Sequence, residues 1–482
     1  MGDDLTVSVG GGSRVALDEL FAEAAALGAL EGACRDWRER AAAIRRGIVQ
    51  SGVSDAPGAG SWGPASGLSH ASSLLETAAW QTQHLRAALV SSAEEYGRAE
   101  RTVTAMWDLG ARYLAANTGL LALFALPFLV VPGMAIGAVL ARAAASGAWN
   151  PKASARAVLS DPDFVRLVRS AGGAADEFLL GLRGLPPSIA MLLGAGVAAP
   201  ENASLLLGAA GGLGLFGSRA FVDGPVAVRR DAAVGVSRVP PPAGVGDIAR
   251  RVPAPAPGAA QIRVERYGPA AAPRWLVYVG GTLAASPVAG AEPLDLTSDV
   301  HAIADDSGLD RFRVSGAESG AADRAVRQAL AEAGARPGDP ILPVGYSAGG
   351  IVAAGMVADH ELNVVGAVNL GGPVASTDLG DVPVLSLEHE EDLIPALGGP
   401  GHPSPGLVTA SRAALPTAEG AGAELLPAHE LARYRETAEL VDHSKAPELA
   451  AFGDLIRDFT GTASGERTDW RASRVSSGPA AR

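Results

Sequence analysis

The stretch that decides the fold runs Ile341-Leu342-Pro343-Val344-Gly345-Tyr346-Ser347-Ala348-Gly349-Gly350. Its apolar start predicts a short buried strand over residues 340–344, and the residues from Ser347 to Asp359 predict a helix. Gly345 and Gly349 flank Ser347 in the pattern G-x-S-x-G, which is typical of a sharp strand-to-helix turn. Side chains at 345 and 349 would clash in such a turn, so the glycines are needed there. The pattern predicts a nucleophilic serine at a helix N-terminus; the alternative is a serine in an ordinary capping turn.

Short apolar strands and helices alternate on both sides of this turn. Further strands are predicted at 262–267, 275–279, 364–370 and 382–388, the first of them at a sheet edge, and a helix at 321–333. Such alternation is typical of a parallel sheet with helices on both faces, so the fold class predicted is α/β.

The acid partner of the serine is expected after a later strand, because acid and histidine follow the serine along the chain in this arrangement. The strand at 382–387 leads into Glu388-His389-Glu390-Glu391-Asp392-Leu393-Ile394-Pro395. Asp392 is the preferred candidate. Glu388, Glu390 and Glu391 remain as rivals, and a solvated acidic loop is the alternative.

The base is expected downstream of the acid, where His402, His429 and His443 occur. His429 lies just before a predicted helix over 430–440, which is the position that favours it. In the predicted roles His429 accepts the Ser347 proton, and Asp392 holds the imidazole tautomer and stabilises its charged form.

Two backbone N–H groups are expected to stabilise a developing oxyanion. One belongs to Ala348, the residue after the serine, and the other to Gly281 or Thr282, which follow the strand at 275–279. The alternative for Gly280-Gly281-Thr282 is an ordinary strand-ending turn.

Several of these segments together resemble an actinobacterial α/β-hydrolase domain: Trp275 to Thr282, Asp295 to Asp299, Ala321 to Gly350, Asp392 and His429. Asp392-Leu393-Ile394-Pro395 resembles the acid loop of lipases, and His429 to Tyr434 resembles the histidine segment of these hydrolases. The resemblance covers residues 261–460. It implies hydrolysis of ester or lipid-like substrates through an acyl-enzyme, without a cofactor or a metal.

The N-terminal part predicts a helical hairpin, with helices at 15–50 and 68–112 joined by a Gly- and Pro-rich loop. Trp62-Gly63 in the loop, and the Tyr-x-x-x-Glu spacing of Tyr96 and Glu100, resemble WxG proteins exported by type VII secretion. The resemblance implies a secretion signal and a helical WxG-type partner. Trp62 is followed directly by Gly63, and helical sequence continues beyond Glu100, both of which depart from the family pattern. A solvated helix face is the alternative for the tyrosine and glutamate.

Charge and composition exclude some function classes. The net charge is −13 and no long basic run occurs, which argues against a nucleic-acid partner. Cys34 is the only cysteine, so an intramolecular disulfide or a cysteine metal site is not expected. The start of the chain lacks a Sec signal pattern. The expected location is secreted or associated with the cell envelope, with a cytoplasmic location as the alternative.

A segment at 119–141 is almost continuously apolar and is long enough to contact a membrane. Pro127 and Pro132 would interrupt a single spanning helix, so a buried helical hairpin is the alternative.

These observations divide the chain into five parts. The predicted division is a helical hairpin at 1–115, a hydrophobic helical region at 116–235, a Pro-rich linker at 236–260, the α/β domain at 261–460 and a disordered tail at 461–482. Asp161-Pro162-Asp163 marks a predicted helix start within the second part.

Overall fold

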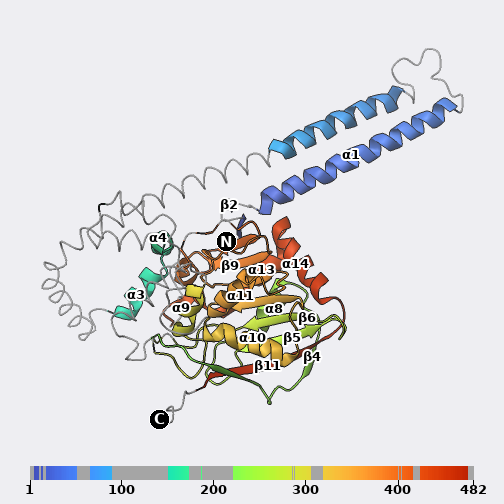
Figure 1. The fold of residues 1–482 in the computed structure, drawn as a ribbon. Coiled ribbons are helices and arrows are strands. Elements are labelled where there is room, and N and C mark those ends of the chain that lie inside the picture. The colour runs from blue at the N-terminus through green and yellow to red at the C-terminus, as the bar shows by residue number, and fades with distance from the viewer. Residues whose placement is uncertain are drawn as a thin grey trace, which may run out of the picture.

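The computed structural model describes an α/β body from which a long helical hairpin projects (Figure 1). The residues that it describes are 5–9, 12–14, 18–50, 66–88, 150–172, 186, 221–284, 286, 288–305, 319–399, 401–402, 404–415 and 424–475. Trp62, Gly63, Tyr96, Glu100 and the apolar segment 119–141 lie outside the described residues.

One mixed sheet forms the centre of the body, with the strand order β2-β1-β10-β9-β8-β7-β6-β5-β11-β3 and with β4 paired to β11. Its central strands run parallel to one another: β6 (Arg274–Val279), β7 (Ile341–Tyr346), β8 (Ala367–Leu370), β9 (Val384–His389) and β10 (Leu407–Arg412). The flanking strands pair antiparallel: β1 (Thr6–Val9), β2 (Gly12–Arg14), β3 (Val226–Arg230), β4 (Ser237–Val239), β5 (Ile262–Tyr267) and β11 (Gly465–Arg474). The predicted α/β class is confirmed.

Helices cover both faces of the sheet, as the alternating pattern predicts. On one face lie α10 (Ala321–Ala333) and α11 (Ala348–Ala358), with α9 (Leu296–Asp305) packed against both. On the other lie α8 (Val245–Arg251), α13 (Leu431–His443) and α14 (Pro447–Thr460). Along β6, Val277 and Val279 pack toward the first group, and Leu276 and Tyr278 toward the second. This two-residue alternation is what a strand buried on both faces requires.

The predicted disordered tail is wrong, because β11 lies within it and pairs with β3, β4 and β5. The charged sequence of β11 is typical of a solvated segment, but its arginines pair with acidic residues of neighbouring segments. Arg471 contacts Asp231, and Arg474 binds both Asp223 and Asp295. Because β5 pairs with β11 as well as β6, the prediction of an edge strand at 262–267 is wrong too.

The predicted Pro-rich linker is also wrong. Residues 236–260 contain β4 and the buried helix α8, in which Val245, Ile248 and Ala249 are fully covered. Asp442 of α13 accepts hydrogen bonds from the N–H groups of Val245 and Gly246 at 2.7 and 2.8 Å, and so supplies the cap that the helix lacks locally.

The N-terminal helical region is not separate from the sheet. Strands β1 and β2 extend the sheet beyond β10, and β3 lies at the opposite edge, although the predicted division assigns these residues to the helical parts 1–115 and 116–235. Residues 15–225 therefore form an insertion that leaves the sheet at one edge and returns at the other. This arrangement depends on residues far apart in the sequence, such as Thr6, which pairs with Ser411. Local sequence patterns cannot predict such a contact.

Within this insertion the predicted helical hairpin is confirmed as far as it is described. Helix α1 (Asp18–Gln50) runs antiparallel to a helical segment at 66–88, with contacts from Arg45 to Ser69 and from Arg38 to Glu76. Two shorter helices follow, α3 (Pro151–Leu159) and α4 (Pro162–Gly172). Asp161 accepts hydrogen bonds from the N–H groups of residues 163 and 164, so α4 begins where predicted. Among the described helices, none combines the length and the apolar character needed to cross a membrane.

Candidate active site

Ser347 stands at the turn from β7 into α11 with φ 55° and ψ −119°. This positive φ is rare for a residue with a side chain and costs on the order of 1–3 kcal/mol. The backbone of the turn is held on both sides, since the Ser347 N–H donates to Leu370 O at 2.9 Å and the Gly350 N–H donates to Ser347 O at 2.8 Å. The predicted sharp strand-to-helix turn is therefore present.

The glycines of this turn have no room for a side chain. A Cβ at 345 would lie 1.9 Å from Gly349 O, and one at 349 would lie 2.3 Å from Val279 O. A Cβ at Gly350 would meet Asn369 Oδ1, also at 1.9 Å. The predicted clash is present at both 345 and 349, and Gly350 is equally constrained.

The three residues singled out from the sequence lie in one chain of hydrogen bonds. His429 Nε2 lies 2.9 Å from Ser347 Oγ, and His429 Nδ1 lies 2.6 Å from Asp392 Oδ2. Asp392 caps α12 (Leu393–Ala396) after β9, and His429 ends the short 3-10 helix Pro427–His429 before α13. With Asp392 ionised, Nδ1–H donates to the carboxylate, which leaves Nε2 free to accept the serine proton.

The rival residues have other partners. Glu388 binds Arg169, Glu391 accepts from the N–H groups of Ala414 and Leu415, and Glu390 is exposed. Of the histidines, His402 lies by Ser404 and His443 by Glu439 O. Only His429 and Asp392, among these candidates, are joined to Ser347 in the described part of the chain.

Asp392 is buried and accepts three hydrogen bonds. Besides His429, Tyr434 OH donates to Oδ2 at 2.6 Å, and the Ile394 N–H donates to Oδ1 at 2.9 Å. Burial, together with the charge of Asp392, raises the pKa of Tyr434 well above its ordinary value, so the phenol keeps its proton as a donor. The three hydrogen bonds thereby fix the carboxyl group in place away from solvent.

A second buried histidine supports the loop that carries His429. The ring of His389, at the end of β9, stacks on Tyr434 at 4.0 Å. Its Nδ1–H donates to Ala428 O at 2.7 Å, and Nε2 lies 2.8 Å from Thr437 Oγ1. Sequence reasoning assigned His389 no role, although it lies in the quoted acid loop. Its burial lowers its pKa to about 4, so it is a neutral positioning group near pH 7.

His389→Gln should make the stability less dependent on pH. The folded protein holds His389 neutral, whereas the unfolded chain takes up a proton below its ordinary pKa of 6.5. The free energy of unfolding is therefore unaffected by this proton above pH 6.5, and it decreases progressively as the pH falls toward 4. In urea unfolding, wild type should lose on the order of 2 kcal/mol more than the variant between pH 7 and pH 4.5. Parallel stability curves for the two proteins would contradict the assignment.

The backbone predicted to bind an oxyanion lies beside Ser347. The loop lies in close contact with Tyr346 and Ser347, because a Cβ at Gly281 would lie 2.8 Å from the Tyr346 ring and 3.2 Å from Ser347 Cβ. Among hydrogen bonds between described residues, none uses the N–H of Gly281, Thr282 or Ala348 as donor.

A half-buried carboxyl group lies behind this loop. Thr282 Oγ1 donates to Asp299 Oδ2 at 2.9 Å, which ties the loop to α9. Burial raises the pKa of Asp299 to about 7. Thr282 is therefore held in place by its side chain.

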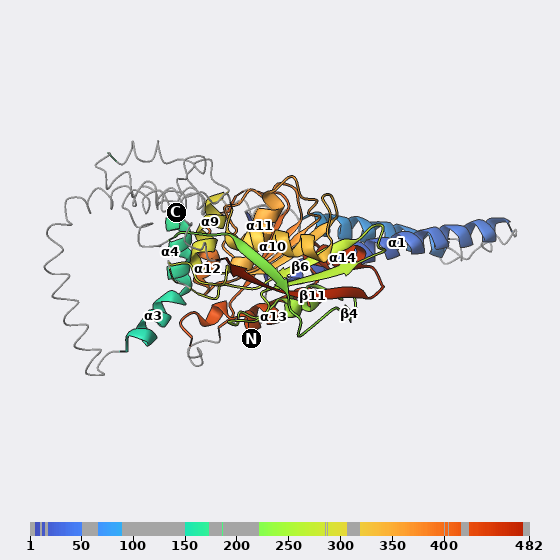
Figure 2. The same cartoon turned by 60° about the horizontal axis from the view of Figure 1, so that its bottom comes forward.

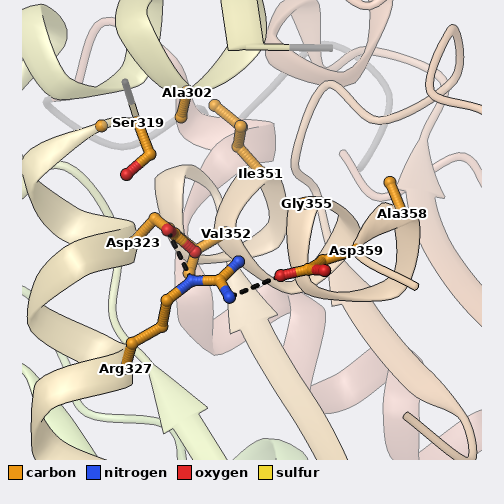
Figure 3. Close-up of a pocket in the computed structure, with 10 residues that line it drawn as sticks. Ala302, Ser319, Asp323, Arg327, Ile351, Val352, Gly355, Ala358 and Asp359 are labelled. Carbon is orange, nitrogen blue, oxygen red and sulfur yellow. Dashed lines mark hydrogen bonds and ion pairs between the residues drawn. The ribbon is translucent and has the colours of Figure 1, made fainter. Parts of the chain in front are cut away.

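The cavity in Figure 3 is a separate feature on the α10 and α11 face. It holds about 200 Å³ and is lined by Ala302, Ser319, Gly320, Asp323, Arg327, Ile351, Val352, Gly355, Ala358 and Asp359. Arg327 bridges Asp323 and Asp359 at 2.8 and 2.6 Å. Neither Ser347 nor its two partners lines this cavity, so the arginine joins α10 to the end of α11 rather than serving the serine.

Within the described residues, no group of three or more His, Cys, Asp or Glu side chains is placed to hold a metal ion. No family model, curated protein or solved structure matches this chain. The hydrogen bonds around Ser347 allow a proton to pass from its hydroxyl to His429, and Asp392 lies where it can stabilise the resulting imidazolium.

Proposed function

We propose that this protein is a serine hydrolase of the α/β-hydrolase type, which cleaves carboxylic esters through Ser347, His429 and Asp392. The main support is the chain of hydrogen bonds that joins His429 to Ser347 at 2.9 Å and to Asp392 at 2.6 Å, together with the positive φ of the serine. Supporting it, the serine follows the central strand β7, the acid follows β9 and the histidine precedes α13, which is the order of that fold.

The proposed reaction has two halves. In the first, His429 takes the Ser347 proton while Oγ attacks the ester carbonyl carbon. The N–H groups of Ala348 and of Gly281 or Thr282 stabilise the tetrahedral oxyanion. The C–O bond to the alcohol breaks, and His429 gives its proton to the departing oxygen, which leaves an acyl group on Ser347.

In the second half, water replaces the alcohol. His429 removes a proton from the water as its oxygen attacks the acyl carbon, and it then returns that proton to Ser347 Oγ as the carboxylic acid leaves. Asp392 remains ionised throughout and stabilises the imidazolium that forms twice per turnover. Each step uses only groups of this chain, the ester and water.

Hydrolysis of p-nitrophenyl esters from acetate to palmitate tests the proposal. Turnover that requires Ser347 would support it, and the chain length at which kcat/KM is highest would distinguish an esterase from a lipase. A folded wild type that turns over none of the series and does not react with a fluorophosphonate at Ser347 would contradict it.

A second candidate function is binding of a helical partner through the hairpin, as the WxG resemblance implies. Leu30, Trp37 and Ile44 are each more than half exposed on α1 and recur at seven-residue intervals, so they share one helix face. Leu74, Trp80 and Leu85 are similarly exposed on the segment at 66–88. Heptad spacing of large apolar side chains suits packing against another helix, and we propose a WxG-type helical hairpin as the partner. Export and an envelope location belong to this candidate.

Trp37→Lys combined with Ile44→Lys should remove this partner without changing ester hydrolysis. The two lysines would place charge in the centre of the apolar face, where a packed helix cannot solvate it. The measurement is cross-linking of the tagged chain in the cells that produce it, followed by identification of the captured proteins. Glu39→Lys, at an exposed position of the same helix, is the matched control. Capture of the same helical protein by the double variant would exclude this face.

A further inference from the structure

Helix α4, from the N-terminal insertion, lies against the loop that carries Asp392. It packs on α12, and the two helices lie side by side at the same end of the sheet (Figure 2). Asp392 Oδ1 accepts the Ile394 N–H at the start of α12, so α12 and the carboxylate are one unit. A displacement of α4 would therefore act on the proposed catalytic acid through its capping helix.

The same helix supplies a charge to the site. Arg169 Nη2 lies 2.5 Å from Glu388 Oε2, and the Glu388 side chain is 8% exposed. Glu388 is the penultimate residue of β9, four positions before Asp392. The pKa of the Arg169 guanidinium is raised chiefly by the charge of Glu388, and also by Tyr434 and Asp392. Arg169 is thus the counter-charge for the buried carboxylate of Glu388.

The segment that carries α4 also contacts the loop that carries the histidine. Arg156 Nε of α3 donates to Glu424 O at 2.8 Å, five residues before His429. One short segment, residues 150–172, therefore contacts the acid loop through Arg169 and α4, and the histidine loop through Arg156.

We propose that Arg169 is a positioning residue for the hydrolase site, which holds Glu388 neutralised beside the Asp392–His429 pair and so couples the N-terminal insertion to catalysis. The inference rests on the proposed function and adds to it the residue through which the insertion acts. Without Arg169, the Glu388 carboxylate would be a buried charge without a partner, which is a costly state that favours a displacement of the loop.

The electrostatic consequence has a definite sign. An unneutralised Glu388 adds negative potential near His429, which favours the imidazolium and opposes its action as a base. The acidic limb of the rate profile should then move to higher pH. The other ionisable groups around Asp392 and His429 come from several elements: Tyr434 on α13, Tyr346 on β7, His389 on β9, Arg412 on β10 and Glu430 before α13. Arg169→Met replaces none of them and changes their surroundings only by removing the guanidinium charge.

The test compares Arg169→Met, Glu388→Gln, the double variant and wild type. The readout is the pH profile of Ser347 labelling by a fluorophosphonate, together with kcat/KM for p-nitrophenyl butyrate. Arg169→Met should lower both rates about tenfold at pH 7 and move the acidic limb upward by about half a pH unit or more. Both rates in the double variant should be within about threefold of wild type, because this variant lacks the Glu388 carboxylate as well as Arg169.

Arg166→Met on the same helix is the matched control. Arg166 is exposed and pairs only with the exposed Asp163 among the described residues, so its loss should leave both readouts unchanged. A wild-type profile for Arg169→Met would overturn the inference, and a double variant as impaired as Arg169→Met would show that the arginine acts by packing and not by charge. A wild type that does not label at Ser347 would instead overturn the proposed function, and this inference with it.

Discussion

Ser347→Ala is expected to lower kcat for p-nitrophenyl butyrate by a factor on the order of 10⁴–10⁶ while the fold persists. The variant removes the one atom that forms the acyl-enzyme. Its methyl group occupies less space than the hydroxymethyl group, so the packing of α11 against β7 should remain. The residual rate reflects the oxyanion groups alone, which still stabilise direct attack by water.

Three measurements make this result decisive. Circular dichroism and thermal unfolding show whether the variant is folded, and mass spectrometry locates the fluorophosphonate adduct of the wild type on the peptide containing Ser347. The matched control is Ser473→Ala, at an exposed position of β11, which should retain full turnover. Ester hydrolysis that survives in folded Ser347→Ala would assign the activity to another residue.

Asp392→Asn is expected to lower kcat by about 10²–10⁴-fold, less than loss of the serine. The carboxylate accepts from Ile394 N–H on one oxygen, and from His429 and Tyr434 on the other. An asparagine that keeps its oxygen toward Ile394 turns its NH₂ group toward His429. The imidazole must then accept at Nδ1 and carry its proton on Nε2, where it can no longer take the proton of Ser347.

The control for this variant is Glu390→Gln, two residues earlier in the same acidic loop and exposed to solvent. It removes the same charge at almost the same place in the sequence and should leave the rate unchanged. Equal losses in Asp392→Asn and Glu390→Gln would mean that the loop acts through its overall charge, and Asp392 would then not be the specific partner of His429.

Local patterns were sufficient to predict the centre of the fold and the candidate site. Gly345 and Gly349 indicate a turn whose geometry is determined by about ten consecutive residues. Helix α10 occupies the range 321–333 that its periodicity predicts. Asp392 and His429 could be chosen because each lies next to a predicted element, at the strand end and the helix start. In each case the decisive information is local in the sequence.

The flanks of the sheet could not be predicted, because their stability comes from distant partners. Strand β11 reads as a polar tail until Asp231, Asp223 and Asp295 are placed beside its arginines. Helix α8 lacks its own cap and takes one from Asp442, almost 200 residues later. Arg169 belongs to no sequence motif. Its pairing with Glu388 depends on the packing of α4 against the acid loop, which the sequence does not indicate.

The pairing of β1 with β10 has a consequence for biosynthesis. Thr6 emerges from the ribosome about 400 residues before Ser411, its partner in the sheet. At roughly 5–20 residues per second this delay is about 20–80 seconds, far longer than hairpin formation. During translation β1 and β2 therefore remain without their partner strand for this time, and this edge of the sheet can form only after β10 has been synthesised. A fragment that begins at residue 261 would lack β1 and would expose the unpaired edge of β10, which favours aggregation.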